Sequence, residues 1–105
     1  MTLANPLGPP RRGRAEVENA TRAAAANFTG GSGRFEQVSS CHTADLEHTV
    51  ELEHFKVQLA GSENPATTAR RVTTVFRREG DSLKVAHRHA DPITTDRSIG
   101  TILDP

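Results

Sequence analysis

The sequence has few large apolar side chains. It contains no Trp or Tyr, four Phe and one Met, and Leu, Ile, Val and Phe together occupy 21 of its 105 positions. A chain of this length fits one domain and buries only about two thirds of its surface on folding. We therefore expect a thin core, with marginal stability or support from a partner subunit. Global disorder is not expected, because 13 basic residues balance 13 acidic ones.

Three further absences exclude classes of function and location. The zero net charge argues against a sequence-independent nucleic-acid binder, which needs surplus Lys and Arg. There is no apolar run of about 20 residues to cross a membrane, and Met1–Pro6 has no signal-peptide pattern, so we predict a cytoplasmic protein. The single cysteine, Cys41, excludes an internal disulfide and a Cys-rich zinc site.

The first 33 residues predict a short strand and one helix. Thr2–Ala4 is a strand candidate that Asn5-Pro6 stops. After Gly13, a stripe at helical spacing is formed by Val17, Ala20, Ala24 and Phe28. Phe28 is the only large side chain of this stripe. Gly30-Gly31 is expected to end this helix. Because the stripe offers little apolar area, the helix is predicted to cover a sheet as a lid.

Residues 34–91 predict antiparallel strands. Apolar residues and histidines alternate with acidic residues and threonine from Leu46 to His54, which is the period of a strand. The apolar positions then change parity at Phe55, Val57 and Leu59, which predicts a β-bulge near His54 and Phe55.

A hairpin is expected to complete the sheet. After a turn at residues 61–65, Arg71–Arg77 is a β-branched strand, and residues 79–82 reverse the chain into a last strand that Pro92 closes. One face of that last strand is predicted to hold Leu83, Val85, His87, His89 and Asp91. The result is an α+β domain with a curved antiparallel sheet packed on one helix, followed by an irregular tail over residues 93–105.

Two stretches resemble a known family. Residues 2–13, TLANPLGPPRRG, and residues 71–79 with 85–92, RVTTVFRRE and VAHRHADP, are similar to the SnoaL-like branch of the nuclear transport factor 2 and ketosteroid isomerase family. The resemblance covers residues 2–92 and implies one SnoaL-like domain over residues 1–92. It also implies a cone-shaped, cystatin-like or nuclear transport factor 2-like fold around a pocket, and a homodimer formed through the sheet.

The resemblance also shows departures from the family pattern. Two helices that usually precede the first strand do not occur before Thr2, so we expect either a start codon assigned too late or a truncated member with an open pocket. The carboxylate base of the isomerases would fall at Asn5, and the oxyanion-hole acid would fall near Thr74. An amide cannot take a proton at neutral pH, and the chain has no tyrosine. Ketosteroid isomerisation by a carboxylate base is therefore not expected.

The candidate site is a pocket in the sheet. It is predicted to be lined by the following residues: Asn5, Phe28, Val72, Thr74, Phe76, Leu83, Val85, His87 and His89. His87 and His89 are the candidates for acid–base catalysis, because imidazole can accept and donate protons near pH 7. With Asp91 they form a His-x-His-x-Asp pattern, but residues at i and i+2 share a metal only if their side chains converge. No metal or cofactor is expected.

Two hypotheses for function follow. In the first, the pocket binds a small apolar or carbonyl-containing molecule, with or without acid–base chemistry of the isomerase, cyclase or hydrolase type. In the second, the chain is a non-catalytic dimeric module whose exposed sheet is the interface. The basic pairs at Arg11, Arg70 and Arg77 have no aromatic residues between them, so they are expected to keep strand ends soluble rather than to bind nucleic acid.

Overall fold

The computed structural model describes residues 1–103 and contains one α-helix and six strands. The sheet has the order β2-β1-β6-β5-β4-β3, and the four long strands pair antiparallel. The elements are, in chain order, β1 (Thr2–Ala4), β2 (Arg11–Arg12), α1 (Arg14–Ala25), β3 (Phe28–His42), β4 (Leu46–Leu59), β5 (Pro65–Glu79), β6 (Ser82–Asp91) and a 3-10 helix, η1 (Ile99–Ile102).

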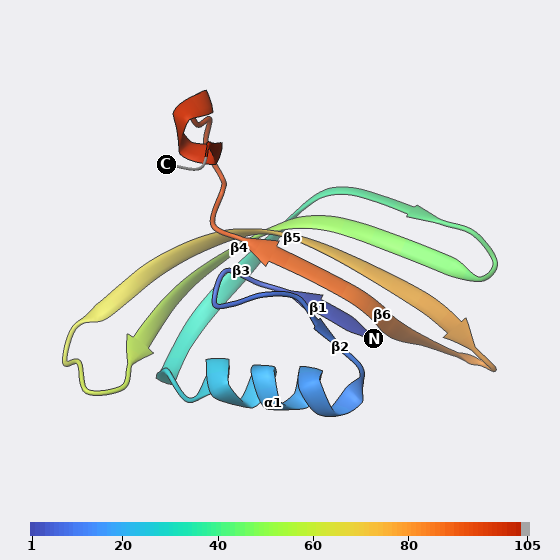
Figure 1. Ribbon diagram of the computed structural model, residues 1–105, viewed down its shortest axis with the longest axis horizontal. Coiled ribbons are helices and arrows are strands. Elements are labelled where there is room, and N and C mark those ends of the chain that lie inside the picture. The colour runs from blue at the N-terminus through green and yellow to red at the C-terminus, as the bar shows by residue number, and fades with distance from the viewer. Residues whose placement is uncertain (104–105) are drawn as a thin grey trace.

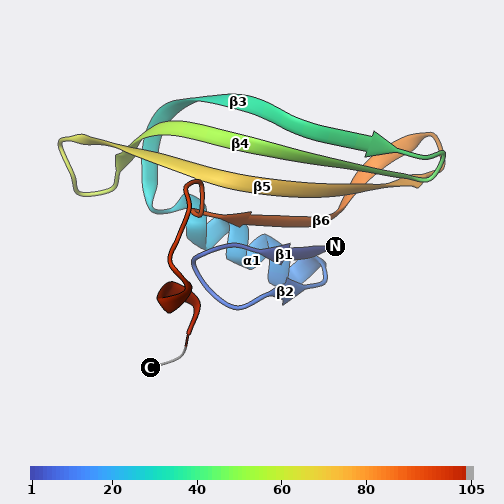
Figure 2. The ribbon, with the colours of Figure 1, turned by 90° about the horizontal axis from the view of Figure 1, so that it is seen from above.

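The sheet is curved and open, and α1 lies beneath its hollow side (Figure 1). β1 joins the sheet through a parallel pairing with β6, in which Leu3 is the partner of Arg88. Seen from above, β3 forms one border of the sheet, and α1 lies on the side of β6, β1 and β2 (Figure 2). This arrangement confirms the predicted α+β fold with a curved sheet over a single helix.

The helix is shorter than predicted. Its N-terminal neighbour Gly13 has φ 86°, a conformation that glycine adopts readily, and the Gly13 amide donates to the carbonyl of Met1 at 3.0 Å. At the other end, the side-chain amide of Asn27 donates to the carbonyl of Ala24 at 3.0 Å, which satisfies a terminal carbonyl. Phe28 and Gly30-Gly31 therefore belong to β3, and the prediction that they extend and end the helix is wrong.

The predicted bulge near His54 and Phe55 is also wrong. The pairing of β4 with β5 runs without interruption from Leu46 opposite Arg77 to Gln58 opposite Pro65. The apolar positions change parity along β4 because the apolar residues of its first half lie on one face of the sheet and those of its second half lie on the other. Leu52 belongs to one face and Phe55 to the other, and an unbroken strand accommodates both.

The bulges occur in other strands. Register shifts leave Thr29 and Val38 of β3 without a partner in β4, and they leave Ala86 of β6 without a partner in β5. An extra residue in one strand increases the local twist and bends the sheet. These three positions, rather than β4, mark the irregular points of the curved wall.

The core is thin, as expected. Among residues 1–103, the buried apolar residues are Leu3, Val17, Val72 and Ala90, and the one buried charged residue is Glu53, with 7% exposed. Val17 is the buried residue of α1. Within the same range, no helix is long and apolar enough to span a membrane.

Candidate functional site

The register of the sheet assigns each residue to one of two faces. Directly paired residues of neighbouring strands share a face. Leu3 lines a cavity together with Ala20 of α1, so its face is the hollow one that the helix covers. Following the pairs outward from Leu3 and Arg88 places these residues on the hollow face: Thr74, Val72, Arg70, Glu51, Glu53, Phe55 and Val57.

A buried carboxylate lies on this hollow face. Glu53 of β4 accepts two hydrogen bonds from Nη2 of Arg88, at 2.9 Å to Oε1 and 3.0 Å to Oε2. Nη2 of Arg70, the cross-strand neighbour on β5, lies 3.3 Å from Oε2. The side chains of Arg70 and Arg88 are 30% and 28% exposed, so both are partly buried. Two positive charges therefore surround one negative charge.

Arg70 has unused capacity to donate a hydrogen bond. Its Nε is buried and has no hydrogen-bond partner within residues 1–103. A buried donor without a partner costs about 1–3 kcal/mol, so an acceptor at this position would be stabilising. Because the cluster carries one surplus positive charge, an oxygen that is negative or strongly polarised suits it best.

Two aromatic rings, those of Phe55 and Phe35, pack beside Arg70. The guanidinium carbon of Arg70 lies 5.2 Å from the centroid of the Phe55 ring, and Phe35 packs against the same ring edge-to-face with centroids 5.9 Å apart. Gly33 lies opposite Phe55 on β3, and a Cβ there would stand 2.3 Å from the ring. The absence of a side chain at Gly33 is what leaves room for Phe55.

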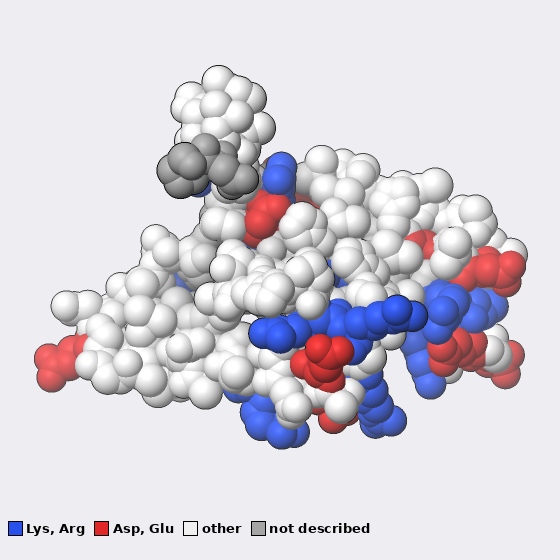
Figure 3. Space-filling model, viewed as in Figure 1, with Lys and Arg blue, Asp and Glu red and all other residues white. Residues whose placement is uncertain are grey.

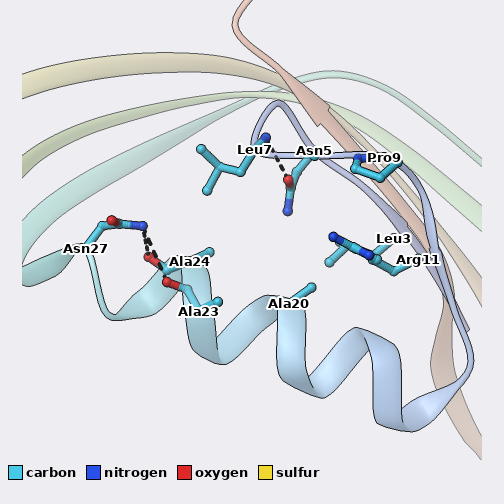
Figure 4. Close-up of a pocket in the computed structure, with 10 residues that line it drawn as sticks. Leu3, Asn5, Leu7, Pro9, Arg11, Ala20, Ala23, Ala24 and Asn27 are labelled. Atoms are coloured by element: carbon cyan, nitrogen blue, oxygen red, sulfur yellow. Dashed lines mark hydrogen bonds between the residues drawn. The ribbon is translucent and has the colours of Figure 1, made fainter.

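The cavity that Leu3 and Ala20 line lies between the N-terminal loop and the helix. It has a volume of about 330 Å³ and includes Asn5, Leu7 and Ala20 in its lining (Figure 4). Asn5 is fixed by its own turn, because its Oδ1 accepts a hydrogen bond from the amide of Leu7 at 3.0 Å. The predicted pocket residue Asn5 thus lines this cavity, outside the Glu53 cluster.

Most of the other predicted pocket residues lie on the hollow face. Pairing along β5 and β6 places these on it: Val72, Thr74, Phe76, Leu83 and Val85. Phe28 is on the same face at the start of β3, with 41% exposed. The structure therefore brings the apolar and hydroxyl residues of the prediction to one side of the sheet.

His87 and His89 lie on the opposite, outer face. Their partners on β5 are Val75 and Thr73, which alternate with the hollow-facing Val72 and Thr74. The physical reason is the bulge at Ala86, since one extra residue reverses the parity between Val85 and His87. The prediction that these two imidazoles share the hollow with Val72 and Val85 is wrong.

The outer-face histidines have local partners. His87 is hydrogen-bonded through Nδ1 to the hydroxyl of Thr2, and Nε2 of His89 lies 3.2 Å from Oδ2 of Asp91. Burial raises the pKa of Asp91, but hydrogen bonds from Arg71 and from the amide of Ile93 outweigh it and leave this pKa below its usual value. Over the part of the chain that the structure describes, no three His, Cys, Asp or Glu side chains are placed to share a metal ion.

Sequence reasoning missed the charged cluster. The alternation along β4 predicts a strand but not the partners of its acidic residues, and the Arg70-Arg71 pair was expected only to keep a strand end soluble. A signal was nevertheless present in the sequence, because a chain reversal centred on Gly61-Ser62 places Glu53 opposite Arg70.

A separate group of charges of both signs lies on the surface where β5 turns into β6 (Figure 3). There, nitrogen atoms of Arg77 and Lys84 lie 3.0 and 3.6 Å from carboxylate oxygens of Glu79.

Comparisons with known proteins agree with this architecture. A search among curated protein sequences finds no match. Two solved structures are similar to the chain. A Thiobacillus denitrificans protein described as a calcium/calmodulin-dependent protein kinase type II association domain has 27% identity and a TM-score of 0.72, with 88% of this chain and 71% of that chain covered.

The second is a Streptomyces avermitilis protein described as a dehydratase of the NTF2-like family. It has 22% identity and a TM-score of 0.77, with 90% of this chain and 68% of that chain covered, so it supports the fold alone. The family model of the SnoaL-like domain matches residues 5–94, which is most of the chain. The chain therefore belongs to the SnoaL-like domain family and has the NTF2-like fold.

Proposed function

We propose that the protein binds a small organic molecule in the hollow of the sheet, and that the molecule has a carbonyl or carboxylate oxygen on an apolar body. The observation that supports this most directly is the buried Glu53 with two arginines around it. A single carboxylate would be neutralised by one arginine, so the second guanidinium remains available to a ligand oxygen. The Arg70 side chain, which is 30% exposed, is the expected contact.

The surroundings favour a ligand with an apolar part. Phe55 and Val57 of β4 and Val72 of β5 occupy the same face as Arg70. Ligand sites in proteins are mostly apolar with a few placed polar groups that set orientation. In this arrangement the apolar side chains hold the body of the molecule, and Arg70 with the Thr74 hydroxyl orients its oxygen.

Proton transfer in this hollow would have to use groups other than the two histidines, because His87 and His89 lie on the outer face. Both oxygens of Glu53 already accept hydrogen bonds from Arg88. Glu53 would have to release one of these before it could act as a base. Binding without catalysis is therefore the function that the geometry supports best.

The test is titration with two matched probes, followed by NMR chemical shifts of backbone amides. Phenylacetate supplies a carboxylate on an apolar ring, and 2-phenylethanol keeps the ring without the carboxylate. We expect phenylacetate to shift the amides of Val72 and Thr74 and to bind Arg70→Met at least about fivefold more weakly. Lys56→Met removes a positive charge on the outer face and is the matched control.

Three results would count against the proposal: no binding of phenylacetate up to about 10 mM, equal binding by Arg70→Met, or shifts confined to the outer face. A double variant, His87→Ala with His89→Ala, separates the two faces. This variant should bind phenylacetate as wild type does. Loss of phenylacetate binding in this variant would instead place the binding site at the two histidines.

A second function, a homodimer through the sheet, is favoured by the outer face. Val50, Leu52 and Val75 form an apolar group there that is only half-buried. The similar protein from Thiobacillus denitrificans is described as an association domain. Sedimentation velocity of wild type and Val50→Asp tests this function. A wild-type dimer that Val50→Asp dissociates supports it, and a dimer that is insensitive to Val50→Asp contradicts it.

A further inference from the structure

The strand β3 leaves a long edge of the sheet without a partner. It has 15 residues, all of them exposed, and it occupies the last position in the strand order. Within residues 1–103 no strand lies beyond it, and Figure 2 shows no other element against its outer side. An edge strand presents a row of free N–H and C=O groups that can pair with another strand.

The usual protections of an edge are weak in the middle of β3. Its bulges at Thr29 and Val38 limit the regular stretch to residues 30–37. This stretch contains no proline and has one charge of each sign, Arg34 and Glu36, so it does not repel its own copy as a run of lysines would. Between them, Phe35 is 62% exposed.

The order of these three residues is self-complementary for antiparallel pairing. Directly opposite residues must share a face, so a two-fold pairing places one residue of the regular stretch opposite its own copy. With Phe35 at that position, Arg34 stands opposite the partner's Glu36, and Glu36 stands opposite the partner's Arg34. Both ion pairs then lie on the outer face and the two Phe35 rings meet on the hollow face.

The neighbouring registers are less favourable. Centring the pairing on Arg34 places two guanidinium groups opposite each other, and centring it on Glu36 places two carboxylates opposite each other. Like charges at directly opposed positions destabilise a pair of strands. Centring it on Gly33 places Arg34 opposite Ser32, which leaves both charges without an opposite partner.

We propose that two copies of this protein associate edge to edge through β3, antiparallel, with Phe35 opposite the partner's Phe35. The pairing joins the two sheets into one continuous sheet. It is distinct from the outer-face dimer described above, since it uses the border of the sheet and leaves Val50 and Val75 uncovered. α1 does not obstruct it, because the helix lies on the side of β6, β1 and β2 (Figure 2).

Charge reversal tests the register by sedimentation velocity at low salt. Arg34→Glu alone and Glu36→Arg alone each place like charges opposite one another twice. Each should weaken self-association by roughly tenfold or more. An equimolar mixture of the two variants restores both opposite-charge pairs in a heterodimer, and the double variant restores them in a homodimer.

The expected pattern is therefore weak association of each single variant and recovery in the mixture and in the double variant. Single variants that associate like wild type, or a mixture that does not recover, would overturn the proposal. Val50→Asp distinguishes the two interfaces: it should leave edge pairing intact, and a dimer that only Val50→Asp dissociates belongs to the outer face.

Disulfide trapping tests the same register by a second route. In a Cys41→Ser background, Phe35→Cys places two thiols opposite each other at the two-fold axis, and mild oxidation should yield a covalent dimer. Gln37→Cys, on the same strand and face, stands opposite the partner's Gly33 and should remain largely monomeric. Equal trapping at both positions, or none at position 35, would rule out this register.

Discussion

Glu53 and Arg88 lie on strands that are separated by β5, and both oxygens of the Glu53 carboxylate still accept hydrogen bonds from one nitrogen of Arg88, at 2.9 and 3.0 Å. The side chain of Arg88 therefore crosses the hollow face of β5 to reach β4. This contact ties three strands together and sets the charge at the bottom of the hollow.

Removing the charge of Glu53 should destabilise the fold. In Glu53→Gln the guanidinium groups of Arg70 and Arg88 lose their counter-charge in a largely buried place, and we expect the free energy of unfolding to fall by about 1–3 kcal/mol. Partial exposure of both arginines keeps the loss below that of a fully buried pair. Urea denaturation measures it. Glu51→Gln, on the same strand and face, is the control and should change stability by less than about 0.5 kcal/mol; equal effects would contradict the role of Glu53.

A side chain at Gly33 should displace the ring of Phe55. A Cβ at Gly33 would stand 2.3 Å from that ring, whereas a Cβ at Gly30 has no atom within 4 Å. Gly33→Ala is therefore expected to lower the free energy of unfolding by about 1–3 kcal/mol through overpacking. Gly30→Ala on the same strand should be nearly neutral. Chemical denaturation compares them, and NMR of the Phe55 ring protons should shift for Gly33→Ala alone.

The helix should depend on one apolar anchor. Val17 is 6% exposed and is the buried residue of α1. Val17→Ala should cost about 1–2 kcal/mol of stability, because it removes buried methyl groups where little else holds the helix. Thr21→Ala, at an exposed position of the same helix, is the matched control. If thermal melts show equal midpoints for the two variants, the helix is held by other contacts.

Acid should remove a contribution from Asp91. Its pKa is lowered in the folded protein, so the carboxylate contributes stability above the pKa of the unfolded chain. That contribution is lost as the pH falls through the lowered folded value, in the range below about pH 4. Asp91→Asn should therefore be less stable than wild type at pH 7, with the difference shrinking toward pH 2.

Urea denaturation at several pH values checks this sign. Glu63→Gln in the exposed turn between β4 and β5 is the control for a general loss of negative charge. A difference between wild type and Asp91→Asn that grows on acidification would show that the pKa of Asp91 is raised rather than lowered.

Much of the fold was predictable from local patterns. The period of two along β4, the β-branched run of β5 and the reversal before Ser82 each specify a strand or a turn by steric and hydrogen-bonding rules that act over a few residues. The end of the helix was not predictable from local patterns. Asn27 ends α1 because its side chain donates a hydrogen bond to a backbone carbonyl, and Phe28 pairs with Leu59 in the sheet. That competition depends on a strand about 30 residues away.

The candidate site was predictable only in part. Val72, Thr74 and Phe76 alternate on an uninterrupted strand, so their common face follows from the sequence once β5 is recognised. The face of His87 depends on whether Ala86 is paired, and an alternating pattern does not reveal a skipped partner. One unpaired residue was enough to move both imidazoles to the other side of the sheet.

The sequence by itself determined the family, the types of secondary structure and the scarcity of apolar residues that keeps the core thin, because these depend on residue identity and short spacings. Only the tertiary structure decided which side chains meet in the hollow. Glu53, Arg70 and Arg88 come together because strands distant in sequence are aligned in one register, and the position of a side chain above or below the sheet is a property of that alignment.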